Sequence, residues 1–134
     1  MCNITGNYSK KSFTGYKVVC EMDGKYYSPA TGIEYKKGPV EIPVVQQRLC
    51  NWFSDTLLLP DGYGYKPDMK GYTAVFVNQY NAMCTWKELA FWYDSPYKLK
   101  VVKMTISHKL QYGTYGHDNV ILGKRIDKIE EVCV

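Results

Sequence analysis

Few residues of this sequence have types and spacings that suit chemistry. The histidines His108 and His117 stand nine positions apart, and neither has a neighbour at metal-ligand spacing. Cys84, His117 and Asp118 are of the types that form a nucleophile, a base and an orienting group in a thiol hydrolase. Three such residues occur in most chains of this length, and a thiol leading into a helix is commonly a core residue. The sequence therefore predicts no metal and no cofactor, and it favours binding over catalysis.

Tyrosines beside glycines give the strongest binding signal. Thirteen tyrosines occur in 134 residues, and several fall in expected loops. Tyrosine offers a large contact area with a polar tip, and glycine lets a partner approach the backbone. The alternative is that these rings seal the loops against the core. The candidate binding residues are Tyr63, Tyr65, Tyr72, Tyr112 and Tyr115, with His117 and Asp118 adding polar contacts.

The basic residues are nearly all lysine. Only Arg48 and Arg125 are arginine among the seventeen basic residues of a chain whose net charge is +4. Proteins that read bases and phosphates favour arginine, because its planar fork makes bidentate contacts that lysine cannot make. The lysines are also spread along the chain without a dense block. This pattern argues against nucleic acid as a partner.

Cysteine usage and hydropathy indicate the compartment. The five cysteines lie at spacings that fit neither a disulfide framework nor a zinc knuckle. Residues 1–11 have no apolar stretch before their lysines, so we expect no secretory signal. The longest apolar runs fall far short of the roughly 20 residues of a membrane span. We expect free thiols in a reducing cytoplasm and no membrane.

The first half of the chain predicts a polar leader and two hairpins. Residues 1–14 are polar and expected to be loosely ordered, ahead of a single domain over residues 15–134. The strands Tyr16–Glu21 and Lys25–Ser28 flank an Asp-Gly pair, which is a strong hairpin signal. A second hairpin is expected between residues 33–35 and 40–42.

Two helices and several further strands complete the expected domain. Apolar residues at helical spacing predict a helix over residues 43–55, and the capping-box pattern Thr85–Glu88 predicts another that starts at Thr85 with Trp86 facing the core. Glycine-rich stretches predict loops over 57–72 and 110–118. The expected strands are residues 73–77, 99–106, 120–122 and 125–132, with Val102, Met104 and Ile106 facing inward and a bulge between Ile126 and Ile129. The predicted fold class is α+β, a mainly antiparallel sheet with two short helices.

The order of these motifs resembles a loose group of small phage and large-virus proteins. The matching residues are Tyr16–Val19, Gly71-Tyr72 with Phe76, Val101–Ile106 and Lys128–Glu131. The resemblance covers about residues 15 to 132, and it departs from the group's commoner form at Thr73, where histidine is frequent. It implies a viral origin and no particular reaction.

The layout is also similar, more distantly, to ADP-ribosyltransferase folds. That family needs an arginine or histidine on its first strand, where Tyr16-Lys17 stands here, and a Ser-Thr-Ser element that residues 72–78 lack. Glu130 and Glu131 would be the only site residues that it implies.

The combined interpretation is a virus-encoded accessory protein of the host cytoplasm. It would bind a host protein or a small ligand, for example as a host-defence inhibitor. A minor virion structural component and a nucleotide-directed enzyme with the ADP-ribosyltransferase layout are the alternatives.

The cysteine spacing yields a redox prediction. All five thiols should be free in the folded protein, so dithiothreitol should leave the Tm unchanged. Thermal melts with and without reductant measure this. A drop of several degrees on reduction would reveal a disulfide and a different compartment.

Overall fold

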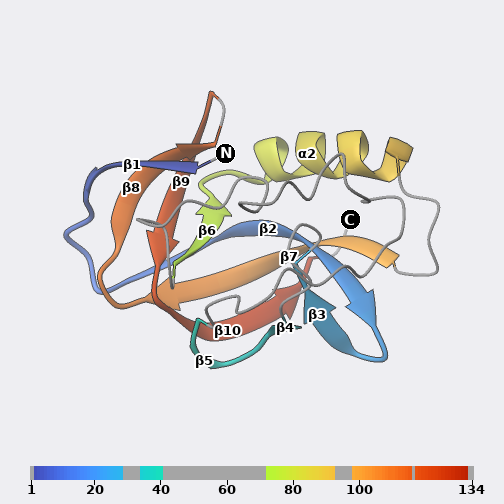
Figure 1. Ribbon diagram of the computed structural model, residues 1–134, viewed down its shortest axis with the longest axis horizontal. Helices are drawn as coiled ribbons and strands as arrows, with labels where there is room; N and C mark the ends of the chain where they lie inside the picture. The colour runs from blue at the N-terminus through green and yellow to red at the C-terminus, as the bar shows by residue number, and fades with distance from the viewer. Residues whose placement is uncertain (1, 29–33, 41–71, 93–97, 116, 133–134) are drawn as a thin grey trace, which may run out of the picture.

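The computed structural model describes residues 2–28, 34–40, 72–92, 98–115 and 117–132 (Figure 1). These residues form one helix and ten strands, and the strand pairings among them are antiparallel. The helix is α2 (Gln79–Trp92), and the strands are β1 (Cys2–Asn7), β2 (Ser12–Met22), β3 (Lys25–Tyr27), β4 (Glu34–Tyr35), β5 (Gly38–Pro39), β6 (Thr73–Phe76), β7 (Lys98–Ser107), β8 (Gln111–Tyr115), β9 (Asp118–Gly123) and β10 (Arg125–Glu131).

The prediction of an α+β fold with two short helices is wrong. The described part of the chain is mostly antiparallel sheet with a single helix, so the fold leans towards all-β. The expected helix over residues 43–55 lies outside the described residues, as do residues 57–71 of the expected long loop. Two segments that look like a leader and a loop in the sequence pair as strands instead.

One of these segments is the polar leader, residues 1–14. Its residues 2–7 form β1, which pairs with β8 from Cys2↔Tyr115 to Asn7↔Gln111, and β2 begins at Ser12. The other segment is the expected loop over residues 110–118, which contains β8 and the start of β9. Gly113 is buried in β8, where it pairs with Ile4 of β1 on one side and with Val120 of β9 on the other.

β2 lies at the centre of the sheet, whose order is β1-β8-β9-β6-β2-β7-β10-β5. One edge of β2 pairs with β7 along ten residue pairs, from Ser12↔Ser107 to Glu21↔Lys98. Its other edge is shared between β6, at Tyr16↔Phe76, and β3, which in turn pairs with β4. Figure 1 shows the resulting twisted sheet with α2 lying along one face.

Two hairpins were expected in the first half of the chain, and one is confirmed. Asp23 and Gly24 join β2 to β3 with φ angles of 53° and 77°, as a tight turn with two left-handed residues requires. The described residues do not form the second expected hairpin, between residues 33–35 and 40–42, and residues 33, 41 and 42 lie outside them. β4 pairs with β3 and β5 pairs with β10, so partners distant in sequence override the local turn signal.

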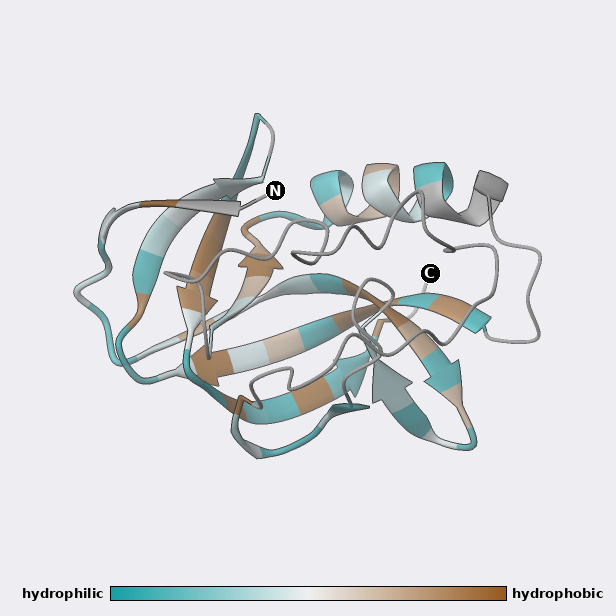
Figure 2. Ribbon diagram, viewed as in Figure 1, coloured by the Kyte–Doolittle hydropathy of each residue, from teal (hydrophilic) through white to brown (hydrophobic). Residues whose placement is uncertain are grey.

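The sheet buries apolar side chains on both faces. The face under α2 holds the cluster Val18, Phe76, Ala82, Val101, Val120 and Leu122. The opposite face holds Val75, Met104, Ile106, Leu110, Ile121 and Ile126. The predicted inward orientation of Val102, Met104 and Ile106 is confirmed, because each is 0% exposed. Figure 2 shows the same hydrophobic character along β6 and β9.

α2 begins earlier than the sequence predicts. The expected start at Thr85 is wrong, because the Oδ1 of Asn78 accepts the N–H of Asn81 at 2.9 Å and caps a helix that starts at Gln79. The additional turn brings Ala82 into the core. Trp86 faces the core as predicted.

The last strand has the predicted bulge. β10 pairs with β7, and its register shifts between Ile126 and Lys128. Residues three positions apart in a regular strand point to opposite faces. The extra residue of the bulge changes this, so Ile126 and Ile129 both face the core.

Gly15 marks the closest approach of two strands. A Cβ at Gly15 would lie 2.5 Å from the carbonyl oxygen of Phe76 and 2.5 Å from Cγ2 of Val75. β2 can therefore approach β6 at this point only without a side chain.

Substitution of Gly15 tests this contact. Gly15→Ala should lower the free energy of unfolding by about 1–3 kcal/mol, because the new methyl group overpacks the β2–β6 crossing. Gly6→Ala is the matched control, since its Cβ meets nothing within 4 Å, and we expect a change below about 0.5 kcal/mol. Urea denaturation measures both. Equal effects of the two substitutions would contradict the β2–β6 contact.

Candidate functional site

The structure separates the tyrosines that the sequence singles out. Tyr63 and Tyr65 lie outside the described residues. Tyr112 and Tyr115 lie on strand β8, not in a loop, and three positions apart they point to opposite faces. Tyr112 is 48% exposed and meets the Tyr8 ring edge-on, with the ring centroids 5.1 Å apart. Tyr115 packs against Phe76, with the centroids 5.7 Å apart.

The remaining candidates are also dispersed. Tyr72 is half-buried, and the ammonium of Lys124 lies 4.9 Å from the centre of its ring. His117 is exposed near the β8–β9 turn, and Asp118 pairs with Tyr115 across that turn. The structure thus brings Tyr115 and Asp118 together and leaves Tyr112 on another face.

Cys84 is an exposed free thiol on α2. The contact that the structure gives it is with the Tyr80 hydroxyl one helical turn earlier, and this hydrogen bond raises the pKa of Tyr80. In the described part of the chain this thiol is paired with a tyrosine, whereas a thiol hydrolase needs a base beside it.

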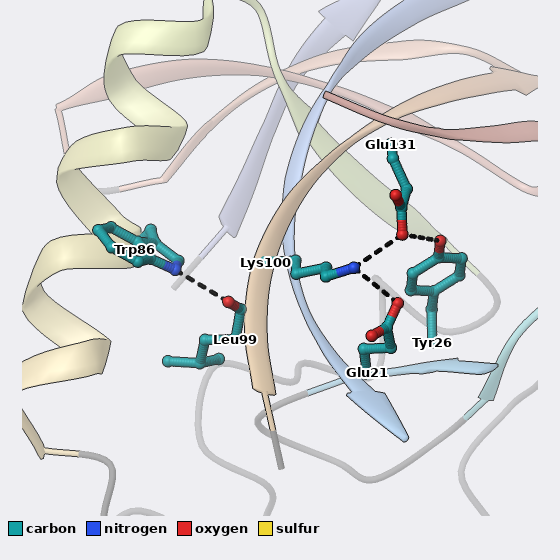
Figure 3. A network of polar contacts seen from close by, with 6 residues as sticks. All are labelled: Glu21, Tyr26, Trp86, Leu99, Lys100 and Glu131. Carbon is teal, nitrogen blue, oxygen red and sulfur yellow. Dashed lines mark hydrogen bonds and ion pairs between the residues drawn. The ribbon is translucent and has the colours of Figure 1, made fainter. Parts of the chain in front are cut away.

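A polar network that the sequence did not suggest joins four strands, because Tyr26 lies on β3. The ammonium of Lys100, on β7, lies 2.8 Å from Oε2 of Glu21, on β2, and 2.7 Å from Oε1 of Glu131, on β10. The hydroxyl of Tyr26 donates to the same Glu131 oxygen at 3.3 Å. Figure 3 shows Lys100 between the two carboxylates, on the side of β7 away from Trp86.

This network holds its charges in the ionised state. The hydrogen bonds to Glu131 and then to Glu21 raise the pKa of Lys100 further above its ordinary alkaline range. The hydrogen bond from Lys100 lowers the pKa of Glu131. Burial, followed by the charge of Glu131, raises the pKa of Tyr26. A general acid or base works best with a pKa near the working pH, and these shifts move all three groups away from neutrality.

Next to this network lies a groove with a volume of about 350 Å³. Its lining combines residues of α2, of the start of β7 and of the end of β10: Met83, Trp86, Lys98, Leu99, Lys100, Val101, Glu131 and Val132. The indole Nε1 of Trp86 donates to the carbonyl of Leu99 at 3.1 Å, which fixes the ring in the groove (Figure 3). The groove is therefore a largely apolar hollow whose aromatic wall is held in place.

Charged residues contribute to the rim of the groove, with the ammonium of Lys100 directed to the side of β7 away from Trp86 (Figure 3). Lys100 lies between two carboxylates, so these three groups together carry one negative charge, and the side chain of Glu131 is 59% exposed. Lys98 is exposed and makes no ion pair within the described residues. The groove thus offers an apolar interior beside a cluster of one lysine and two carboxylates, with Lys98 as a further positive charge in its lining.

The glutamates implied by the ADP-ribosyltransferase layout are both in ion pairs. Glu131 contacts Lys100, and Glu130 contacts Lys128, which lowers the pKa of Glu130. The residues that the structure describes contain no group of three side chains suited to a metal ion. Binding chemistry fits this arrangement better than proton transfer does.

No protein-family model matches this chain, and comparisons with curated proteins and with solved structures found no match. In the described residues, α2 does not have the length and hydropathy to cross a membrane. A functional interpretation therefore starts from the chemistry of the groove.

Sequence reasoning missed this site because its members are far apart in the chain. Lys100 is 79 positions from Glu21 and 31 from Glu131. The one local signal is the pair Lys98 and Lys100 within an apolar strand, where alternate positions share a face.

The pH dependence of stability tests the network. Because the folded pKa of Glu131 is lowered, its contribution is complete above the unfolded pKa and is lost as the pH falls through the folded value. We expect the wild type to have a higher Tm than Glu131→Gln at pH 7. The difference should vanish well below about pH 4, the ordinary range of glutamate.

Glu88→Gln is the control for this experiment, since Glu88 is exposed on α2 and makes no ion pair in the described part of the chain. Its Tm should follow the wild type throughout the titration. If the Tm of Glu131→Gln also followed that of the wild type at every pH, the network would add no stability.

Proposed function

We propose that the chain is a binding protein whose groove between α2 and the ends of β7 and β10 accepts an apolar side chain of a partner protein. The observation that supports this most directly is the fixed indole of Trp86 beside Met83 and Leu99. Aromatic residues held in a desolvated hollow dominate the energetics of protein interfaces. A volume of about 350 Å³ lies at the lower end for ligand sites and suits one anchor side chain.

The charges at the rim favour a partner that is acidic next to its anchor. Lys98 makes no ion pair within the described residues, although Glu21 lies opposite it across the β2–β7 ladder, and the whole chain carries a net charge of +4. Complementary charge speeds association and fixes the orientation of the partner. The occupant that we propose is therefore an extended segment with one large apolar residue flanked by aspartate or glutamate.

The resemblance to phage and large-virus proteins supports the biological setting of this proposal. The protein would be a virus-encoded accessory protein that engages a host protein in the host cytoplasm, for example to inhibit a defence component. A minor virion component would use the same groove on a viral partner. A nucleotide-directed enzyme would instead convert a small molecule, which mass spectrometry of a cell extract incubated with the protein would detect.

Selection from a displayed random-peptide library tests the groove without a known partner. We expect selected peptides to share one large apolar residue with acidic neighbours, and to shift the indole resonance of Trp86 in an NMR titration. Peptides that lack an apolar anchor, or that leave this resonance unchanged, would contradict the proposal.

Variants of the lining give the matching prediction. Val132→Asp should lower the affinity for the selected peptides by about 30-fold, because an anchor contact worth roughly 2 kcal/mol is lost. Lys98→Glu should lower the affinity for acidic peptides and leave the affinity for neutral peptides unchanged. Lys25→Glu is the control, because Lys25 is exposed on β3 and does not line the groove. Fluorescence polarisation measures the affinities, and a Val132→Asp protein that melts normally and binds as tightly as the wild type would overturn the assignment.

A further inference from the structure

A second concavity lies at the opposite end of the β2–β7 ladder. Its volume is about 570 Å³, and the side chains that matter for its chemistry are Tyr8, Lys10, Lys11, Ser107, His108 and Lys109. It shares no residue with the groove beside Trp86.

Two chain corners form this concavity and are held together on both sides. The first corner connects β1 to β2, and the second connects β7 to β8. Asn7 pairs with Gln111 on one side, and Ser12 pairs with Ser107 on the other. Between these pairs the N–H of Tyr8 donates to the carbonyl of Leu110 at 3.0 Å. The sheet therefore positions the two corners before any ligand arrives.

The concavity gathers positive charge. Among the described residues, three lysines line it and no aspartate or glutamate does, in a chain whose total net charge is +4. Asn7, Ser107 and Gln111 add uncharged hydrogen-bonding groups to the same lining. Like charges gathered in a hollow repel one another, so the arrangement favours a multiply charged anion.

The β7–β8 corner presents its side chains from an uncommon backbone conformation. His108 and Lys109 have φ angles of 66° and 52°, in the left-handed region that non-glycine residues rarely adopt. The Nδ1 of His108 lies 3.1 Å from the hydroxyl of Ser107, and this contact orients the imidazole. Residues in this region of backbone conformation cluster at ligand-binding positions, and their local cost is offset by the surrounding structure.

An aromatic wall closes one side. Tyr8 packs edge-on against Phe13 and Tyr112, with centroid distances of 5.7 and 5.1 Å. The ring is fixed by these contacts and lines the concavity, so it offers apolar surface next to the lysines.

We propose that this concavity binds the phosphate groups of a small organic phosphate, such as a nucleoside diphosphate. Lysine binds phosphate as a point charge, and the three lysines surround a hollow large enough for a ligand of this size. The Tyr8 ring contacts the organic part. The near absence of arginine fits a small phosphate better than a nucleic-acid polymer, whose recognition relies on arginine forks.

Calorimetric titration with inorganic pyrophosphate, ADP, adenosine and a single-stranded oligonucleotide tests the proposal. We expect pyrophosphate to bind, ADP to bind more tightly, and adenosine to bind weakly or not at all. Raising the salt concentration should weaken the binding of both pyrophosphate and ADP. An oligonucleotide that binds more tightly than ADP would overturn the assignment to a small ligand.

Paired triple variants localise the site. The first variant combines Lys10→Gln, Lys11→Gln and Lys109→Gln. Its affinity for ADP should fall by at least about tenfold, because charge-assisted hydrogen bonds are lost. The control combines Lys25→Gln, Lys37→Gln and Lys87→Gln, which remove the same charge from exposed positions elsewhere and should change the affinity less than about twofold. Equal losses in the two triple variants would show non-specific attraction and overturn the proposal.

The two proposed sites can fail independently. Val132→Asp should bind ADP like the wild type, and the Lys10, Lys11 and Lys109 triple variant should keep its affinity for groove-binding peptides. Absence of binding by both pyrophosphate and ADP to the wild type would reject the phosphate site and leave the groove untouched.

Discussion

The long antiparallel ladder between β2 and β7 is the constraint on which the rest of the structure depends. Ten residue pairs fix these strands in one register, and nine strand steps extend over about 30 Å. At one end, Glu21↔Lys98 brings β2 beside Lys100, where β10 adds Glu131. At the other end, Ser12↔Ser107 aligns the corners that carry the lysines of the second concavity. One interaction thus positions both candidate sites and keeps them apart.

The register also decides which face each side chain occupies. Val101 packs towards α2, whereas Val102 and Met104 face the opposite core, so a shift of one residue would exchange the two sets. The face under α2 then receives Trp86 at the β7 carbonyl of Leu99. The other face receives the salt bridges of Lys100. Both the apolar groove on one face and the charged network on the other are therefore consequences of strand pairing between distant segments.

The sequence predicts the features of the fold that depend on residues close together in the chain. The alternation in β7, the Asp23-Gly24 turn and the bulge near Ile126 were all foreseen, because each depends on neighbouring residues. β8 was not foreseen, since its glycine suggested a loop while β1 and β9 supply its hydrogen bonds from outside. The helix start was misplaced because Asn78, not Thr85, provides the cap. The spacing of residues along the sequence could not predict the Lys100 network, because its carboxylates come from two other strands.

The most direct test of this account is the β2–β7 register in solution, measured by interstrand backbone NOEs. The account predicts contacts between Thr14 and Thr105 and between Val18 and Val101, as the two hydroxyls 2.7 Å apart at the first pair already indicate. Contacts displaced by one residue, such as Val18 with Val102, would contradict it. Such a slip would place Glu21 and Lys100 on opposite faces of the sheet, break their ion pair, and remove the register on which the proposed groove depends.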